Sequence, residues 1–147
     1  DAAGAVEWLR CTGNGLFTPV ANAFPAGLVP TAAATAADLD GDGDLDLVLA
    51  TAAATAADRV VVLANDGAGG FTLAATAVPV TQLERGERVF AADCDEDGDL
   101  DLLVQGLTLD NRPARLLRND GGFTFVDATG DGTPWRGLPL DGAERVW

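Results

Sequence analysis

The acidic stretch ADLDGDGDLDL at residues 37–47 recurs as ADCDEDGDLDL at residues 92–102. A second element, NDGAGGFT at residues 65–72, recurs as NDGGFT at residues 119–124, and a weaker copy, CTGNGLFT, occupies residues 11–18. Both elements therefore repeat at nearly the same spacing along the chain. A fixed internal period indicates a fold built from similar supersecondary units that stack on one another.

Strand patterns surround both elements. Leucines alternate with other residues after the first acidic stretch, and apolar residues do so again after the second, which is the period of a β-strand. Further β-rich runs flank the Gly-rich elements at 60–63, 71–73, 115–117 and 123–126. Because Asn and Gly tolerate the positive φ of hairpin turns, each flanking pair predicts a β-hairpin. One repeat then holds four short strands, which is typical of a β-propeller blade.

We therefore predict an all-β fold of four-stranded antiparallel blades, with about two complete blades and partial blades at both ends. The expected boundaries are 5–22 for the end of one blade, 31–78 and 87–127 for two full blades, and 144–147 for the start of the next. The sequence ERVW at the C-terminal end resembles ERVF at 87–90. We expect the chain to be a fragment of a larger protein.

The block TAAATAAD occurs twice, at 31–38 and at 51–58. Helix propensity alone would allow either copy to be helical. The first copy occupies the place of the first strand of a blade, so we predict a strand there. The second falls in the linker, where we predict a loop, with a short helical turn as the alternative.

The acidic stretches have the chemistry of cation-binding loops. Carboxylates stand at positions 1, 3, 5 and 9 of a nine-residue loop, and Gly at position 6 permits a sharp turn. Oxygen ligands in a flexible shell favour Ca²⁺ over Mg²⁺, so we predict two calcium sites. The expected carboxylate ligands are Asp38, Asp40, Asp42 and Asp46 in the first loop and Asp93, Asp95, Asp97 and Asp101 in the second, with Asp44 and Asp99 offering backbone carbonyls.

The acidic residues allow other interpretations. A solvated acidic turn is the alternative for both loops, although two copies at one spacing argue against it. An EF-hand or dockerin loop needs an acid at position 12, where this chain has Leu49 and Val104. A third stretch, Asp127 to Trp135, lacks the ninth ligand, and we predict a simple turn there.

Together the strings ADLDGDGDLDLVLA, ADCDEDGDLDLLVQG and NDGAGGFT resemble the FG-GAP/VCBS repeats of integrin-α-like propellers and bacterial surface proteins. The resemblance implies a toroid of about seven blades with calcium loops on one rim, and an extracellular, cell-surface or bacterial periplasmic location. It supplies no ligand-contacting residues, because no recognisable binding motif occurs in the other loops.

The net charge limits the classes of partner that the chain can bind. With 23 acidic residues against 9 basic ones and a net charge of −14, the chain would be repelled by nucleic acid and by anionic membrane surfaces. We expect a recognition or adhesion module for a protein or carbohydrate ligand, joined to the missing blades of its parent chain, with no enzymatic activity. The alternative is the propeller portion of a secreted polysaccharide lyase or hydrolase, but His, Tyr and Lys are absent, which leaves few groups for acid–base catalysis.

The sequence also supports predictions for several single residues. Cys11 and Cys94 are either two free thiols or one disulfide, and the former fits the lack of a disulfide framework better. Trp8 and Trp147 should pack in a core, whereas Trp135 is the candidate for stacking on a sugar. The arginines at 112, 115 and 118 should pair with nearby aspartates.

Overall fold

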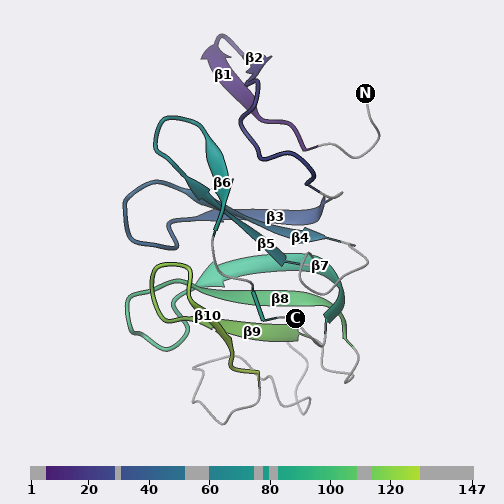
Figure 1. Cartoon of the computed structure of the whole chain (residues 1–147), viewed down its shortest axis with the longest axis vertical. Coiled ribbons are helices and arrows are strands. Elements are labelled where there is room, and N and C mark those ends of the chain that lie inside the picture. The colour runs from purple at the N-terminus through teal and green to yellow at the C-terminus, as the bar shows by residue number, and fades with distance from the viewer. Residues whose placement is uncertain are drawn as a thin grey trace.

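The computed structural model describes residues 6–28, 31–51, 60–74, 78–79, 83–108 and 114–129. Within these ranges the chain is all-β (Figure 1). A two-stranded sheet contains β1 (Leu9–Gly13) and β2 (Leu16–Pro19). The first four-stranded sheet contains β3 (Thr31–Ala37), β4 (Asp46–Thr51), β5 (Val60–Asn65) and β6 (Phe71–Leu73). The second contains β7 (Leu83–Ala92), β8 (Asp101–Thr108), β9 (Ala114–Asn119) and β10 (Phe125–Asp127).

Both four-stranded sheets are antiparallel meanders, in which each strand pairs with its neighbour in sequence. This confirms the predicted fold class of four-stranded antiparallel blades. The expected start of another blade at 144–147 lies outside the described residues, and the boundaries proposed for the blades remain predictions.

The first alanine-rich block is a strand, as predicted. Pairing with β4 aligns Ala34 with Leu49 and Ala36 with Leu47, and exposed residues alternate with more buried ones along β3. Alanine has the highest helix propensity of the amino acids, but propensity contributes little free energy per residue, so the backbone hydrogen bonds and packing of a sheet override it. Of the second copy only Thr51, the last residue of β4, is described, so its predicted loop lies outside the described residues.

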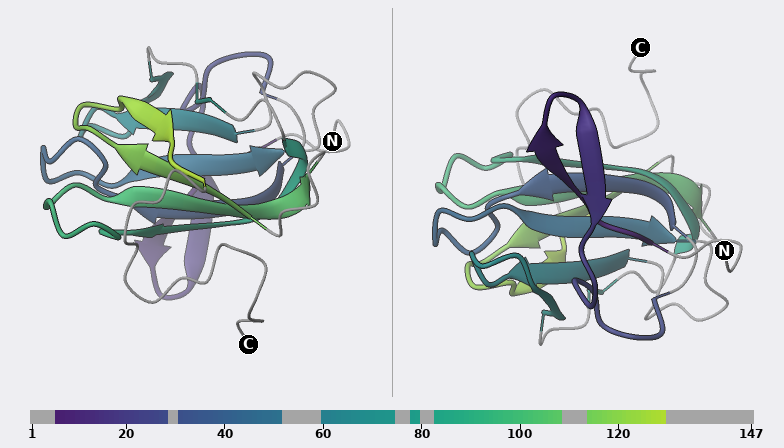
Figure 2. Two further views of the ribbon diagram at one scale, coloured as in Figure 1. Left: turned by 90° about the horizontal axis from the view of Figure 1, so that it is seen from below. Right: turned by 90° about the horizontal axis from the view of Figure 1, so that it is seen from above.

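The two four-stranded sheets pack face to face around one apolar core (Figure 2). From the first sheet this core takes Val48 and Ala50, and from the second it takes Leu102 and Val104. The opposite face of the first sheet has its own cluster around Leu49. Alternate residues of β4 therefore serve different cores, and apolar residues cover both faces of the strand.

Equivalent residues of the two repeats face the same direction along the stack. The cluster of Leu49, Leu63 and Phe71 on the first sheet corresponds to Val104, Leu117 and Phe125 on the second, which lie in the core between the sheets. The N-terminal segment covers the first cluster. Its Trp8 and Phe24 rings lie 4.9 and 5.3 Å from the ring of Phe71. Trp8 thus packs in a core, as expected, whereas Trp135 and Trp147 lie outside the described residues.

One strand prediction was wrong in detail. We expected the last strand of the second blade to begin at Phe123, but Phe123 has a φ of +63° within the turn and β10 begins at Phe125. Phe125 pairs with Asn119, as Phe71 pairs with Asn65. The two turns therefore have the same length, and the Phe-Thr string of the second repeat is out of register with the strand it was matched to.

The acidic loops and the Gly-rich turns of the two four-stranded sheets lie at one end of these sheets (Figure 1). Figure 1 shows the β3–β4 and β7–β8 loops on the same side as the β5–β6 and β9–β10 turns, and Figure 2 shows this from two further directions. The β1–β2 hairpin projects away from the stack at its N-terminal side. No helix in the described part of the chain is long and apolar enough to span a membrane.

Candidate metal centre

The first acidic loop folds around the carboxylate of Asp38. Its Oδ1 accepts a hydrogen bond from the backbone N–H of Gly41 at 2.8 Å, and its Oδ2 accepts one from Gly43 at 3.0 Å. Both glycines have a left-handed backbone, with φ of +78° and +94°. The first aspartate thus caps the loop from within, which curls the backbone so that the following side chains converge.

The second loop is similar but not identical. Asp93 accepts a hydrogen bond from the N–H of Gly98 at 3.1 Å, as Asp38 does from Gly43, and one from the N–H of Asp97 at 3.2 Å, one loop position later than Gly41. Position 4, which is Gly41 in the first loop, is Glu96 here and still has a φ of +65°. A residue with a Cβ carries a steric cost in this region, so the second loop is the more strained copy.

Each loop gathers three aspartates within reach of one ion. In each group the ligand oxygens all lie within 4.8 Å of one another. The groups are Asp38, Asp40 and Asp42 in the first loop and Asp93, Asp95 and Asp101 in the second. The two Asp groups could therefore hold metal ions. The structure does not bring Asp46 into the first group or Asp97 into the second, and the full ligand sets remain predictions.

The ninth aspartate of the first loop is buried. Asp46 is 1% exposed, and its two oxygens accept hydrogen bonds from the N–H groups of Leu39 and Asn65, each at 2.9 Å. One side chain thus joins the loop to the end of β5. Burial raises the pKa of Asp46 above its ordinary value, against the lowering effect of the two backbone donors, and the neighbouring charges of Asp40 and Asp42 raise it further.

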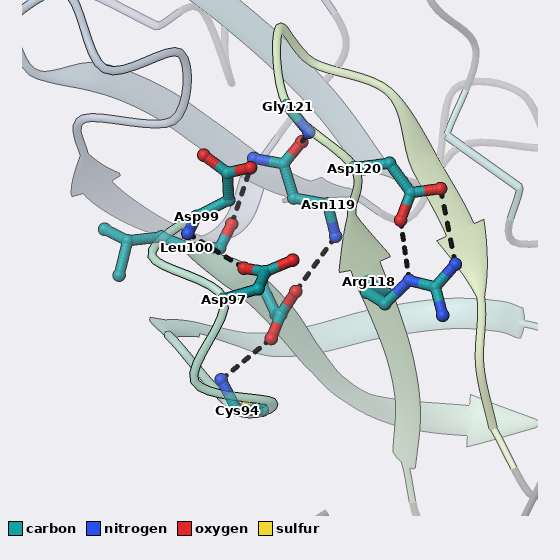
Figure 3. Close-up of polar contacts among 9 residues, drawn as sticks. Cys94, Asp97, Asp99, Leu100, Arg118, Asn119, Asp120 and Gly121 are labelled. Carbon is teal, nitrogen blue, oxygen red and sulfur yellow. Dashed lines mark hydrogen bonds and ion pairs between the residues drawn. The ribbon is translucent and has the colours of Figure 1, made fainter. Parts of the chain in front are cut away.

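Asp101 has the same role in the second loop. It is fully buried and accepts hydrogen bonds from the N–H groups of Cys94 at 2.8 Å and Asn119 at 2.9 Å (Figure 3). Its pKa is also raised, chiefly by burial. The nearby Cys94 thiol is half-buried, and burial together with the charge of Asp101 raises its pKa to about 11. Both Cys94 and the exposed Cys11 are free thiols.

The seventh aspartates point toward the Gly-rich turns. A Cβ at Gly67 would clash with the Asp44 carboxylate, and one at Gly121 would lie 3.4 Å from Oδ2 of Asp99. Gly67 and Gly121 both have a positive φ. The predicted role of Asp44 and Asp99 concerned only their backbone carbonyls, and the position of their side chains shows that the acidic loop and the neighbouring turn pack as one unit.

The sequence pattern did not reveal the contacts of the two asparagines that open these turns. The Asn65 side-chain amide donates to the carbonyl of Leu45 at 2.9 Å, and its oxygen accepts from Gly67 at 3.1 Å. Asn119 makes the equivalent bonds to Leu100 and Gly121, each at 3.2 Å (Figure 3). The recurrence of Asn at this position is the sequence signal for these contacts, but Asn is also favoured in such turns for its backbone conformation alone.

The carboxylate oxygens of the two groups of aspartates fit a hard cation. Oδ1 of Asp95 is buried and has no hydrogen-bond donor among the described residues, although it belongs to the second group of aspartates. A buried carboxylate oxygen without a partner is costly, and a cation would satisfy it. Because both groups offer oxygen ligands alone, they suit Ca²⁺ or Mg²⁺ better than softer metals.

The remaining charged residues near the second sheet are partly paired. Arg118 forms two hydrogen bonds with Asp120, at 2.6 and 3.3 Å, and holds the pKa of Asp120 below its ordinary value. Arg115 lies 3.7 Å from Asp127. Two of the three predicted arginine–aspartate pairings are thus confirmed, and Arg112 lies outside the described residues. Of the predicted turn at 127–135, Asp127 to Thr129 are described, and Asp127 there accepts from the N–H of Thr129 at 3.0 Å.

Comparison with known proteins gives one family. Residues 1–49 match the FG-GAP-like repeat, a range that ends just after the first acidic loop. No curated protein and no solved structure matched the chain. The resemblance stated from the sequence is therefore confirmed over that range. The second loop has the same spacing of aspartates, and its first and ninth aspartates accept bonds from positions 6 and 2, as in the first loop.

Proposed function

We propose that this chain is a calcium-stabilised segment of a β-propeller in a secreted or cell-surface protein, and that it serves recognition or adhesion without enzymatic activity. One Ca²⁺ would bind in each acidic loop. The observation that carries the proposal is the buried Oδ1 of Asp95, which has no hydrogen-bond partner among the described residues and whose side chain belongs to a group of three aspartates.

The electrostatics of the loops support a stabilising role for the ion. Five aspartates lie within nine residues of each loop, so they repel one another and oppose the curl that Asp38 and Asp93 cap. A bound divalent cation converts this repulsion into attraction. Because Ca²⁺ would bind the folded loops and not the unfolded chain, it raises stability by about 1.4 kcal/mol per site at a tenfold excess over Kd.

A recognition role is supported by the family resemblance and by one surface feature. A cleft of about 370 Å³ lies between residues 6–8 and 20–28, and Trp8, Phe24, Glu7 and Asn22 contribute to its lining. Aromatic rings beside a carboxylate and an amide suit a carbohydrate or peptide ligand. Among the described residues, the groups of acids close enough to share an ion are those of the two loops.

Calorimetric titration with Ca²⁺ tests the proposal, with thermal melting of the same sample in EDTA and in millimolar calcium. We expect two sites, with dissociation constants of roughly 10⁻⁴ to 10⁻³ M as in other extracellular modules, and a clear rise in melting temperature. A parallel titration with Mg²⁺ should give weaker binding. Absence of heat together with unchanged melting would refute the calcium assignment. Turnover of a polysaccharide by the purified chain would refute the non-enzymatic role.

A further inference from the structure

A continuous chain of hydrogen bonds joins the two acidic loops across the two sheets. The N–H of Asn119 donates to Oδ1 of Asp101 at 2.9 Å, and its side-chain amide donates to the carbonyl of Leu39 at 2.8 Å. The N–H of Leu39 in turn donates to Oδ2 of Asp46 at 2.9 Å. The ninth aspartates of the two loops are therefore connected through only two intervening residues, one from each blade.

Every member of this chain is buried. Asp101 and Asn119 are 0% exposed, and Leu39 and Asp46 are 1% exposed. Water cannot readily replace a bond lost here, and in low dielectric each bond is stronger than at the surface. The side chain of Leu39 also lies in the core between the sheets, so its carbonyl cannot shift without disturbing that packing.

The equivalent residue in the first blade provides a contrast. Asn65 makes the same bonds within its own blade, to Asp46 at 2.9 Å and to the carbonyl of Leu45 at 2.9 Å. Only Asn119 is seen, within the described residues, to donate to the acidic loop of the other sheet. Comparing variants of the two asparagines therefore distinguishes the role of this residue within a blade from its role between blades.

We propose that Asn119 couples the two cation sites, so that an ion in one loop raises the affinity of the other. This inference rests on the proposed calcium binding. An ion that orders the first loop fixes the carbonyl of Leu39, which holds Asn119 and through it Asp101, a member of the second group. The second ion then binds a loop that is already ordered, so its binding is opposed by a smaller loss of conformational entropy.

Electrostatic repulsion between the ions acts in the opposite direction. It does not depend on Asn119, which is uncharged, and it is weakened by salt. Titrations at 0.15 M ionic strength or above, where the Debye length is about 8 Å, therefore favour detection of the coupling. Comparison of variants that differ only at asparagines removes the electrostatic contribution from the difference.

The experiment measures calcium affinity of the second loop with the first loop intact or blocked. Asp40→Asn together with Asp42→Asn blocks the first loop at two exposed positions. We expect this block to weaken the second site about threefold to tenfold, the range expected for one net hydrogen bond. In an Asn119→Ala background the block should change the second site by less than about 1.5-fold. In an Asn65→Ala background the coupling should persist.

A second measurement does not require an Asn119 variant to fold. In the chain with the first loop blocked, calcium added to the second loop should shift the NMR resonances of the Leu39 amide and of the Asn119 side-chain amide. Calcium binding with an unchanged second site after the block, and no shift at Leu39, would overturn the coupling and leave the proposed function intact. Equal loss of coupling in the Asn65→Ala background would overturn the assignment to Asn119. Absence of calcium binding would overturn both proposals.

Discussion

Replacing Asp101 with Asn should destabilise the protein even in the absence of calcium. Its two oxygens accept backbone hydrogen bonds from Cys94 at 2.8 Å and Asn119 at 2.9 Å, in a site with no exposure to solvent. An amide keeps one acceptor and places its NH₂ group against the other N–H. Whichever way the amide is turned, one buried donor faces a donor.

The magnitude follows from two opposing effects. A buried unsatisfied N–H costs about 1–3 kcal/mol, and loss of a hydrogen bond to a charged group costs about 1.5–3 kcal/mol. Removing the charge gives part of this back, because burial and the charges of Asp95 and Asp97 raise the pKa of Asp101 and so disfavour its ionised form. We expect a net loss of about 2 kcal/mol, or a fall of roughly 8 °C in melting temperature for a domain of this size.

Asp97→Asn is the matched control. Asp97 is exposed, lies in the same loop and carries the same charge, and its Oδ1 accepts one bond from the N–H of Asp99 at 2.9 Å, which an amide oxygen can retain. In EDTA this variant should melt at the wild-type temperature or slightly above it. Thermal unfolding followed by circular dichroism distinguishes the two variants. If Asp101→Asn and Asp97→Asn melted alike in EDTA, the structural role given to the ninth aspartate would be wrong.

Two pairs of substitutions and one measurement of thiol reactivity test the loops and turns further. Glu96→Gly should stabilise the protein in EDTA by about 1 kcal/mol relative to Glu96→Ala, because both remove the carboxylate and only Gly relieves the φ of +65°; equal melting would contradict the strain. Gly67→Ala should lower the melting temperature more than Gly41→Ala, since both have a positive φ but only the first meets a side chain, and the reverse order would show that the turn can shift. At pH 8 in EDTA the exposed Cys11 should react with a disulfide reagent well before Cys94, whose pKa is about 11, and a single fast phase for both thiols would contradict its burial.

Much of the fold followed from the sequence because the repeat constrains it twice. Two copies of the acidic stretch and of the Gly-rich element gave the number of strands per blade and their order. What could not be predicted was the alignment of short strings inside a turn. The Phe-Thr string at 71–72 recurs at 123–124, but the ladder bonds pair Phe125 with Asn119, and similarity of letters gives no information on that pairing.

The identity of the acids in the candidate site was predictable from the sequence, but their burial was not. Spacing identified the acids, because ligand geometry depends on which residues a tight loop can bring together. Burial was not visible in the spacing: Asp46 and Asp101 look like the other aspartates in sequence, yet they lie inside and bind backbone N–H groups. The role of Asn119 depends on a contact with Leu39, 80 residues away, which no local pattern can report.

The double role of Asp101 predicts how calcium affects the neighbouring turn. Asp101 belongs to the group of aspartates that would hold the ion, and it also accepts the N–H of Asn119, which links the loop to the β9–β10 turn. Removing calcium should therefore speed hydrogen exchange at the Asn119 amide more than at the Ala128 amide, which donates to the carbonyl of Leu116 at 2.9 Å. NMR exchange in EDTA and in millimolar calcium measures both. An equal change at the two amides would mean that calcium acts only through global stability, and it would contradict the link between the loop and the turn through Asp101.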